Sequence, residues 1–503
     1  MISPRVTRVL AASVMVSLAT LIAACRDPGA PPPARNALTL VPHIFEFADG
    51  HADAAEWGRL TVPENRDAAG SRTIDIAFVR FRSTAKRPGP PIFLLEGGPG
   101  LSSIDNTRNV MYPLLPVLRE AGDVITFDQR GVDGESRPAL NCVERWDFPL
   151  DAVRTRDSLL ALARTRSRSC AQFWTGQGVD LGAYHTNASA DDIDAIRSAL
   201  GAARMTLLGG SYGSHLALAT VRRHGTKVDR IIMNGVEGPD HTLKLPSNIQ
   251  KQLENIGRLV AADATMRTLI PDFPGLVRSV AARLKQAPVT IEVPDGSGGA
   301  KARIVLSVFD LQLVTARGLG SSAFIRRLPA AYYDMSNGDF SWLGRAVLDL
   351  SRQPFGRAMS FQMDCASGVS VARMARVQRE TGDTILGNVA DFPCQDVCDA
   401  WVRHDLGPEF RSPLTSAVPA LFISGTIDGR TPPSNAEEIR AGFPNGIHIV
   451  VENAGHGDRE MLMGAPEVRD AIGAFLKGQP VTLRTAALPP LEFAWPATAP
   501  PKR

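Results

Sequence analysis

Short apolar runs, many of them β-branched, alternate with amphipathic helical patterns from about residue 57 onward. This alternation is typical of βαβ units that build a mostly parallel sheet, so the pattern predicts an α/β fold. An antiparallel pair of strands is expected first, followed by central strands and then, much later, by two more strands. In that order the predicted strands are residues 60–63, 74–81, 91–95, 124–127, 205–208, 230–233, 420–424 and 448–452.

Between the early and late strands lie about 180 residues of mainly helical, Arg-rich sequence, and an insertion of that size is expected to form a cap. A capped helix is also predicted to begin at Ser189 and to end at Gly201, just before a central strand. The predicted organisation is a signal peptide (1–24), a lipid-anchored Cys with a Pro-rich linker (25–45), a first core part (46–239), a helical cap (240–411), a second core part (412–480) and a Pro/Ala-rich tail (481–503).

The amino terminus has the pattern of an export signal. Arg5 and Arg8 precede an apolar run over residues 9–24 that is too short for an ordinary membrane span. The run ends at Cys25 in a sequence that resembles the bacterial lipobox, which implies cleavage before Cys25 and its lipidation. The alternative is a plain cleaved signal with an incidental cysteine. We expect an exported protein of the cell envelope, attached to a bacterial membrane through lipidated Cys25.

Composition excludes a collagen, a coiled coil and a disordered chain, and charge names no partner. The chain has 503 residues, of which 44% are hydrophobic and 21% charged, as in soluble globular proteins. Its formal charge is +3, from 55 basic and 52 acidic residues. This balance gives no support to nucleic-acid binding.

Five cysteines remain after the one at position 25 is assigned to the anchor. Export into an oxidising compartment makes disulfides plausible, and an odd number leaves one thiol free. We expect one bridge between Cys142 and Cys170, and a second from Cys365 to either Cys398 or Cys394. Cys394 and Cys398 also have the spacing of two metal ligands, but no second pair with zinc-site spacing accompanies them, so no metal site is expected.

A G-x-S-x-G motif provides the candidate nucleophile. Ser211 lies in Gly209–Gly213, after one predicted strand and before a predicted helix, which is the context of a nucleophile elbow. The alternative is a purely structural glycine turn. A serine hydroxyl needs a base, and the base needs a carboxylate that fixes its orientation.

The base and the acid are expected after late strands, because the chain order in this arrangement is Ser, acid, His. His456 follows the last predicted strand in a loop of small residues and is the predicted base, whereas His448 is expected to be a sheet residue. Asp428 follows the strand at 420–424 and is the predicted acid. Asp458 is the competitor, and a turn-forming role is the alternative for Asp428.

An oxyanion hole needs two backbone N–H groups. Tyr212, the residue after the nucleophile, is expected to supply one. Gly98, in the glycine loop 96–100 after an early strand, is expected to supply the other. That loop lacks the Lys-Ser/Thr ending of a P-loop, so no nucleotide is expected.

These motifs together resemble the proline iminopeptidase and tripeptidyl aminopeptidase branch of the α/β-hydrolase serine peptidases. The resemblance implies an α/β-hydrolase fold with a large helical cap, and an exported hydrolase that releases residues or short peptides from amino termini without a cofactor or a protein partner. The motifs that carry it are Glu96-Gly97-Gly98-Pro99-Gly100, Asp128-Gln129-Arg130-Gly131, Gly209-Gly210-Ser211-Tyr212-Gly213, Ser424-Gly425-Thr426-Ile427-Asp428, Thr431-Pro432-Pro433 and Gly455-His456.

The chain departs from the family pattern at two places. Glu96 stands where proline iminopeptidases typically carry His. The cap segment 363–368 lacks the glutamate with which those enzymes often hold the substrate amine. Glu237 and Asp364 are the candidate substitutes, with a structural salt bridge as the alternative for each.

Two other functions remain open at this stage. A carboxylesterase acting on small or lipid esters would use the same triad, because the cap selects the substrate. An inactive surface-binding protein could also keep the scaffold. Asp128 and Arg130 are expected to brace the loop near the site rather than to perform chemistry.

Overall fold

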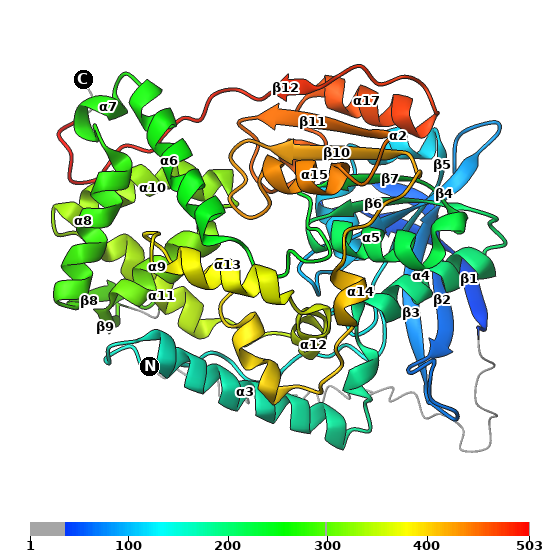
Figure 1. Cartoon of the computed structure of the whole chain (residues 1–503), viewed down its shortest axis with the longest axis horizontal. Coiled ribbons are helices and arrows are strands. Elements are labelled where there is room, and N and C mark those ends of the chain that lie inside the picture. Colours follow the sequence, from blue (N-terminus) through cyan, green and yellow to red (C-terminus); the bar gives the residue numbers. More distant parts are fainter. Residues whose placement is uncertain (1–35, 297–298, 502–503) are drawn as a thin grey trace, which may run out of the picture. The chain divides into compact units, whose positions relative to one another are not determined.

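The computed structural model describes residues 36–296 and 299–501. The predicted signal peptide and Cys25 lie outside the described residues. Residues from 36 onward belong to one compact unit, built on a ten-stranded sheet (Figure 1). The sheet order is β1-β2-β3-β5-β4-β6-β7-β10-β11-β12. The strand bounds are β1 Leu38–Glu46, β2 Ala52–Pro63, β3 Thr73–Phe81, β4 Gly89–Leu95, β5 Gly122–Phe127, β6 Met205–Gly210, β7 Val228–Asn234, β10 Ala420–Gly425, β11 Gly446–Glu452 and β12 Thr485–Ala487.

Antiparallel pairing joins the first strands, and parallel pairing joins the rest. β2 runs antiparallel to β1 and to β3, and β3 runs antiparallel to β5. From β5 to β12 every neighbouring pair is parallel. The predicted mostly parallel sheet with a leading antiparallel pair is therefore confirmed. The carboxyl ends of the parallel strands meet at one edge, where the sites of such sheets form.

Side-chain alternation along the strands produces two apolar layers. Phe93 and Leu207 face the layer that contains α4 and α5, whereas Leu94 and Leu208 face the layer that contains α2 and α17. These strand residues are buried, which is the pattern expected when helices cover both faces of a parallel sheet. The helices beside the sheet are α1 Ser103–Asn106, α2 Leu115–Arg119, α4 Thr186–Ala199, α5 Tyr212–His224, α15 Pro433–Arg440, α16 Asp458–Met461 and α17 Pro466–Leu476.

The segment between β7 and β10 is mainly helical, as the sequence predicts. Figure 1 shows its helices gathered beside the sheet, toward the ends of the β10 and β11 arrows. It also contains the antiparallel hairpin β8–β9, which the sequence pattern did not predict. The elements are α6 Pro246–Ala262, α7 Met266–Leu269, α8 Phe273–Gln286, β8 Val289–Pro294, β9 Lys301–Leu306, α9 Val308–Gly318, α10 Ser322–Ser336, α11 Ser341–Arg352, α12 Ala358–Ser367, α13 Val371–Thr381 and α14 Gly407–Arg411.

A segment before the elbow packs against this helical region. It contains α3 (Arg156–Gly176), which runs below the region in Figure 1. The buried guanidinium of Arg154 pairs with Asp310 at 2.8 Å, and Arg156 pairs with Asp396 at 2.6 Å. The cap is thus built from two stretches of chain, one of which was predicted to belong to the core.

Two terminal predictions need correction. Residues 38–45 were expected in the linker, but they form most of β1, because their backbone groups pair with β2. Residues 481–503 were expected to form a tail outside the core, but Thr485–Ala487 forms β12, which extends the sheet beyond β11. The remaining domain boundaries stay predictions.

The described cysteines form two disulfides. Cys142 is bonded to Cys170, and Cys365 to Cys398, which leaves Cys394 as the free thiol. The first bridge is the predicted one. For the second, the partner of Cys365 is Cys398 and not Cys394. The only described cluster with metal-like spacing includes both sulfurs of the first bridge, so it offers no free thiolate.

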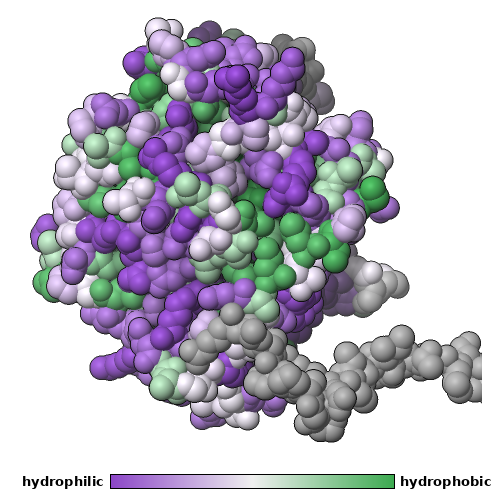
Figure 2. All heavy atoms as spheres, turned by 90° about the vertical axis from the view of Figure 1, so that its right-hand side faces the viewer, coloured by the Kyte–Doolittle hydropathy of each residue, from purple (hydrophilic) through white to green (hydrophobic). Residues whose placement is uncertain are grey.

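Hydrophilic residues cover most of the face shown in Figure 2, with a smaller group of hydrophobic residues among them. On edge strand β1 the Val41 and Ile44 side chains are exposed. Among the described helices, none combines the length and the apolar character that crossing a membrane requires.

Candidate active site

Four loops meet where the parallel strands end. They follow β4, β6, β10 and β11, and they contain Gly98, Ser211, Asp428 and His456 respectively. All four strands run parallel within the same sheet, so their carboxyl ends lie along one edge. Residues far apart in the sequence thereby reach one place.

The turn at Ser211 is tight and strained. Its backbone φ is 54° and ψ is −126°, a conformation that residues with side chains rarely adopt. Glycine is required around it, because a Cβ on Gly213 would lie 1.9 Å from the Leu95 carbonyl oxygen. The strand-turn-helix geometry is that of a nucleophile elbow, with Ser211 immediately before α5.

Asp428 and His456 are in direct contact. The distance from His456 Nδ1 to Asp428 Oδ2 is 2.8 Å, and the Asp428 carboxylate is fully buried. Burial alone would raise the pKa of Asp428, but the His456 charge and hydrogen bonds from His456 and Thr431 lower it to about 2. Asp428 is therefore ionised at neutral pH and can hold the imidazole in one orientation and tautomer.

Thr431 is a third member of this contact. Its Oγ1 donates to Asp428 Oδ2 at 2.7 Å and lies 3.0 Å from His456 Nδ1. Its backbone N–H donates to Asp428 Oδ1 at 3.0 Å, as does that of Arg430 at 2.8 Å. Both carboxylate oxygens are thus fixed. Thr431 stands in a quoted motif, but the sequence alone gave it no role.

The glycine loop after β4 lies directly against the elbow. A Cβ on Gly97 would be 3.0 Å from Ser211 Cβ. The Gly97 N–H donates to the Oε1 atom of Glu96 at 3.0 Å, so it is already engaged. In the described part of the chain, neither the Gly98 nor the Tyr212 N–H has an acceptor. Within the described structure both amides therefore remain available, and Gly98 lines the same cavity as Ser211.

A cavity of about 510 Å³ opens at this edge of the sheet. That volume is within the usual range for sites that bind small ligands. The lining residues that matter below are Gly98, Ser211, Glu237, Lys244, Arg430 and His456.

Asp458, the competing acid, does not contact His456. Its two oxygens accept from Asn234 Nδ2 at 2.6 Å and from Asn106 Nδ2 at 3.0 Å. Glu96 lies nearby, and burial together with the charge of Asp458 raises the pKa of its carboxyl to about 8. Glu96 is therefore mostly protonated at neutral pH, so the glycine loop carries no full negative charge there.

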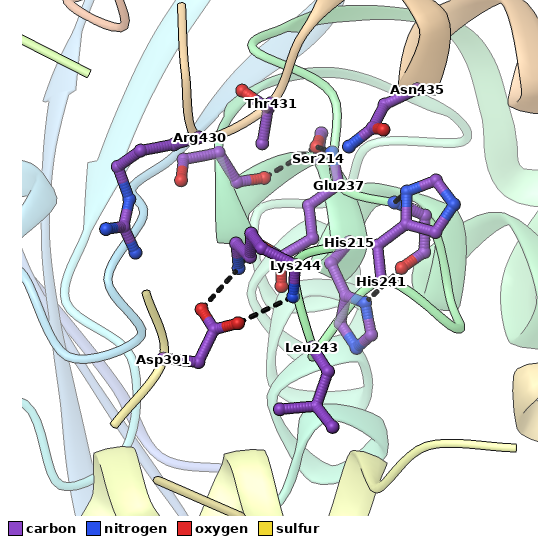
Figure 3. A network of polar contacts seen from close by, with 12 residues as sticks. Ser214, His215, Glu237, His241, Leu243, Lys244, Asp391, Arg430, Thr431 and Asn435 are labelled. Carbon is purple, nitrogen blue, oxygen red and sulfur yellow. Dashed lines mark hydrogen bonds and ion pairs between the residues drawn. The ribbon is translucent and has the colours of Figure 1, made fainter. Parts of the chain in front are cut away.

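The two candidate amine-binding carboxylates differ in position. Figure 3 shows Glu237 and Lys244 close together, with Asp391 on the other side of the lysine. Lys244 Nζ lies 3.0 Å from Glu237 Oε2 and 3.6 Å from Asp391 Oδ1. Burial alone would raise the pKa of Glu237, but the Lys244 ammonium holds it below its ordinary value. Asp364 is not among the residues that line the cavity, and burial raises its pKa to about 7.

Asp128 and Arg130 have bracing contacts. The buried Arg130 guanidinium binds Asp192 on α4 through two hydrogen bonds of 2.7 and 2.8 Å. Asp128 accepts from Ser102 Oγ at 2.7 Å and from the Glu135 N–H at 2.7 Å. Both side chains thus connect segments of the chain that are distant in sequence.

Sequence reasoning did not identify Lys244 or Arg430 as part of this site. Lys244 follows β7 in the stretch that leads into α6, and no motif surrounds it. Arg430 stands two residues after Asp428, so its proximity to the acid was the one available signal.

Comparison with known proteins agrees with this geometry. Over 191 residues the chain is 29% identical to the serine protease Hip1 of Mycobacterium tuberculosis, an alignment that covers 36% of each chain. Over 204 residues it is 29% identical to the tripeptidyl aminopeptidase of Streptomyces lividans, covering 37% of each. The matched part is thus only about a third of these relatives' length.

A solved proline iminopeptidase of Mycobacterium smegmatis is 16% identical, with a TM-score of 0.39 over 83% of this chain and 97% of that one. Residues 90–458 match the family model described as the alpha/beta hydrolase fold. This match extends from the strand before the glycine loop to the loop that carries His456. The chain therefore belongs to the α/β-hydrolase fold family.

Proposed function

We propose that this chain is an exported serine hydrolase that releases residues or short peptides from amino termini through an acyl-enzyme. The observation that carries the proposal is the 2.8 Å contact between His456 and Asp428 beside a cavity that Ser211 also lines. A strained serine turn, a buried carboxylate and a half-buried histidine together have the chemistry of a catalytic triad.

In the proposed reaction, Ser211 Oγ attacks the scissile carbonyl carbon while His456 Nε2 takes the hydroxyl proton. Asp428 accepts a hydrogen bond from the Nδ1–H of His456 and stabilises the imidazolium that forms. The C–N bond then breaks, and the leaving amine takes the proton from His456. Water repeats the sequence on the acyl-enzyme, giving the free acid and regenerating Ser211.

The N–H groups of Gly98 and Tyr212 would stabilise the negative oxygen of each tetrahedral intermediate. Their lack of acceptors in the described part of the chain supports this role. The raised pKa of Glu96 supports it too, because a second ionised carboxyl beside Asp458 would add to the negative charge near this loop.

Glu237 supports an aminopeptidase over an esterase. It lines the same cavity as Ser211, and its Oε1 accepts no hydrogen bond from a described residue. A substrate ammonium could therefore bind Oε1 while Lys244 holds Oε2. The names of the relatives point the same way.

The test is turnover of aminoacyl and tripeptidyl anilides with free and with blocked amino termini, using the soluble form from Arg26. Cleavage of free but not blocked substrates, abolished by Ser211→Ala, would support the proposal. Cleavage of nitrophenyl esters alone would favour the carboxylesterase, and no labelling by a fluorophosphonate probe would favour an inactive binding protein.

We also propose that the exported chain is anchored through lipidated Cys25. Cys25→Ser in the full-length chain should then move the protein from the membrane fraction to the soluble fraction. Retention of that variant on the membrane would contradict the anchor.

A further inference from the structure

Arg430 is a cation in the cavity for which the described residues offer no side-chain partner. Its backbone N–H binds Asp428, while its side chain lines the cavity that Ser211 also lines. The guanidinium makes no hydrogen bond or ion pair with any residue that the structure describes. In Figure 3 it extends away from the loop and no dashed line reaches it.

The other cations of the cavity are already engaged. Lys244 bridges Glu237 and Asp391, at 3.0 and 3.6 Å. Arg459 donates to the carbonyl oxygen of Asn109 at 3.1 Å. Of the three cationic side chains in this lining, Arg430 alone has all its donors available to a ligand.

The stem of Arg430 is held in place. A Cβ on Gly320 would lie 2.9 Å from Arg430 Cγ and 3.0 Å from its Cδ, so the stem packs against the glycine backbone. A guanidinium on a supported stem loses little conformational entropy when it binds. Its planar pair of donors matches the two oxygens of a carboxylate.

Neighbouring charges do not neutralise Arg430. The carboxylates Glu237 and Asp391 are both held by Lys244. The carboxylate of Asp458, which also lines the cavity, accepts from the amides of Asn234 and Asn106. Asp364 lies outside the cavity lining. Burial and the charge of Arg430 both lower the pKa of Lys244, but the carboxylates of Glu237 and Asp391 raise it above its ordinary value overall. An anion from the substrate would relieve the repulsion between the two cations.

We propose that Arg430 binds a carboxylate of the substrate and makes the enzyme prefer peptides that carry a carboxylate near the scissile bond. This inference rests on the proposed function. Glu237 Oε1 for an ammonium and Arg430 for a carboxylate make the cavity complementary to a substrate with both charges. The carboxylate belongs either to an acidic side chain at the amino terminus or to the carboxyl terminus of a short peptide.

Three matched substrate pairs test the proposal. The first pair compares the α-anilide of glutamate, whose γ-carboxylate is free, with the α-anilide of glutamine. The second pair compares a tripeptide whose carboxyl terminus is free with the same tripeptide amidated at that end. The third is the nitrophenyl hemisuccinate against nitrophenyl methyl succinate. In at least one pair the carboxylate member should have a kcat/KM at least about tenfold higher, as expected for a charge-assisted bidentate contact. The pair that shows the preference identifies the source of the carboxylate.

Arg430→Gln should abolish that preference, because it should lower kcat/KM for the carboxylate member of the pair about tenfold more than for the neutral member. Arg430→Lys should keep part of the preference, because lysine retains the positive charge but lacks the two parallel N–H donors of the guanidinium. Arg459→Gln is the matched control and should keep the preference. Equal turnover within every pair, or a preference that survives Arg430→Gln, would overturn the Arg430 proposal alone. Ester turnover without anilide turnover would refute the peptidase, while the third pair still tests Arg430.

Discussion

Replacing Asp428 by Asn tests the proposed triad most directly. The Asp428 Oδ1 accepts the N–H groups of Arg430 and Thr431, whereas Oδ2 faces His456 Nδ1 and Thr431 Oγ1. An asparagine can keep both backbone contacts only if its oxygen takes the Oδ1 position. Its NH₂ group then faces His456 Nδ1, which must become an acceptor and carry its proton on Nε2 instead.

A histidine with its proton on Nε2 cannot take the proton of Ser211. In a serine protease triad, the same substitution lowers kcat about 10⁴-fold through this tautomer change. We expect a similar loss here, which corresponds to about 5 kcal/mol of transition-state free energy. The fold should survive, because the side chain keeps its size and its two backbone contacts.

The assay is kcat/KM on a cleaved anilide or ester, together with urea unfolding to verify the fold. Asp458→Asn is the matched control, since Asp458 contacts Asn234 and Asn106 rather than the histidine. We expect it to lose less than about tenfold. If Asp458→Asn showed the 10⁴-fold loss and Asp428→Asn did not, the assignment of the acid would be wrong.

Three further predictions concern Glu96, Thr431 and the second disulfide. Glu96 has a pKa of about 8 in the fold against an ordinary 4.5, so its contribution to stability is complete below pH 4.5 and lost as pH rises through 8. kcat/KM should also fall above pH 8, and Glu96→Gln should remove both effects in pH-rate and urea-unfolding profiles; identical profiles would contradict them. Thr431→Val removes a hydrogen bond to an ionised carboxylate and should lower kcat about tenfold to a hundredfold with little change in KM, whereas an unchanged kcat would show that the hydroxyl is dispensable. Replacing Cys365 and Cys398 by Ser should lower the free energy of unfolding by about 2–4 kcal/mol in urea, with Cys394→Ala as the free-thiol control; equal losses in both would rule out the bridge as the cause.

Local pattern was sufficient for eight of the twelve described strands and for the motif loops. Each of the eight predicted strands is present, because alternation of apolar residues and turn residues at their ends are local properties of the chain. Once the parallel sheet is inferred, the loops of Ser211, Asp428 and His456 must share an edge. The contact between Asp428 and His456 follows from that topology.

Local pattern failed where a distant partner decides the conformation. β1 is held in place by backbone pairing with β2, and residues 38–45 by themselves do not show that this partner is available. The helix predicted to begin at Ser189 begins at Thr186, with His185 as its cap. Thr186 and Ser189 are buried in the fold, and Thr186 lies 3.0 Å from the hydroxyl of Tyr212, so tertiary contacts add a turn to the helix.

The charged residues of the cavity also separate what the sequence determines from what the tertiary structure determines. The sequence by itself determined the chemical groups of the triad and their order, since motif and strand context are local. It could not determine that Lys244 holds Glu237, or that the Arg430 side chain pairs with none of the described residues, because such pairing depends on tertiary packing around the cavity. Electrostatic energy depends on distance and burial, and only the tertiary structure sets these for residues far apart in the chain.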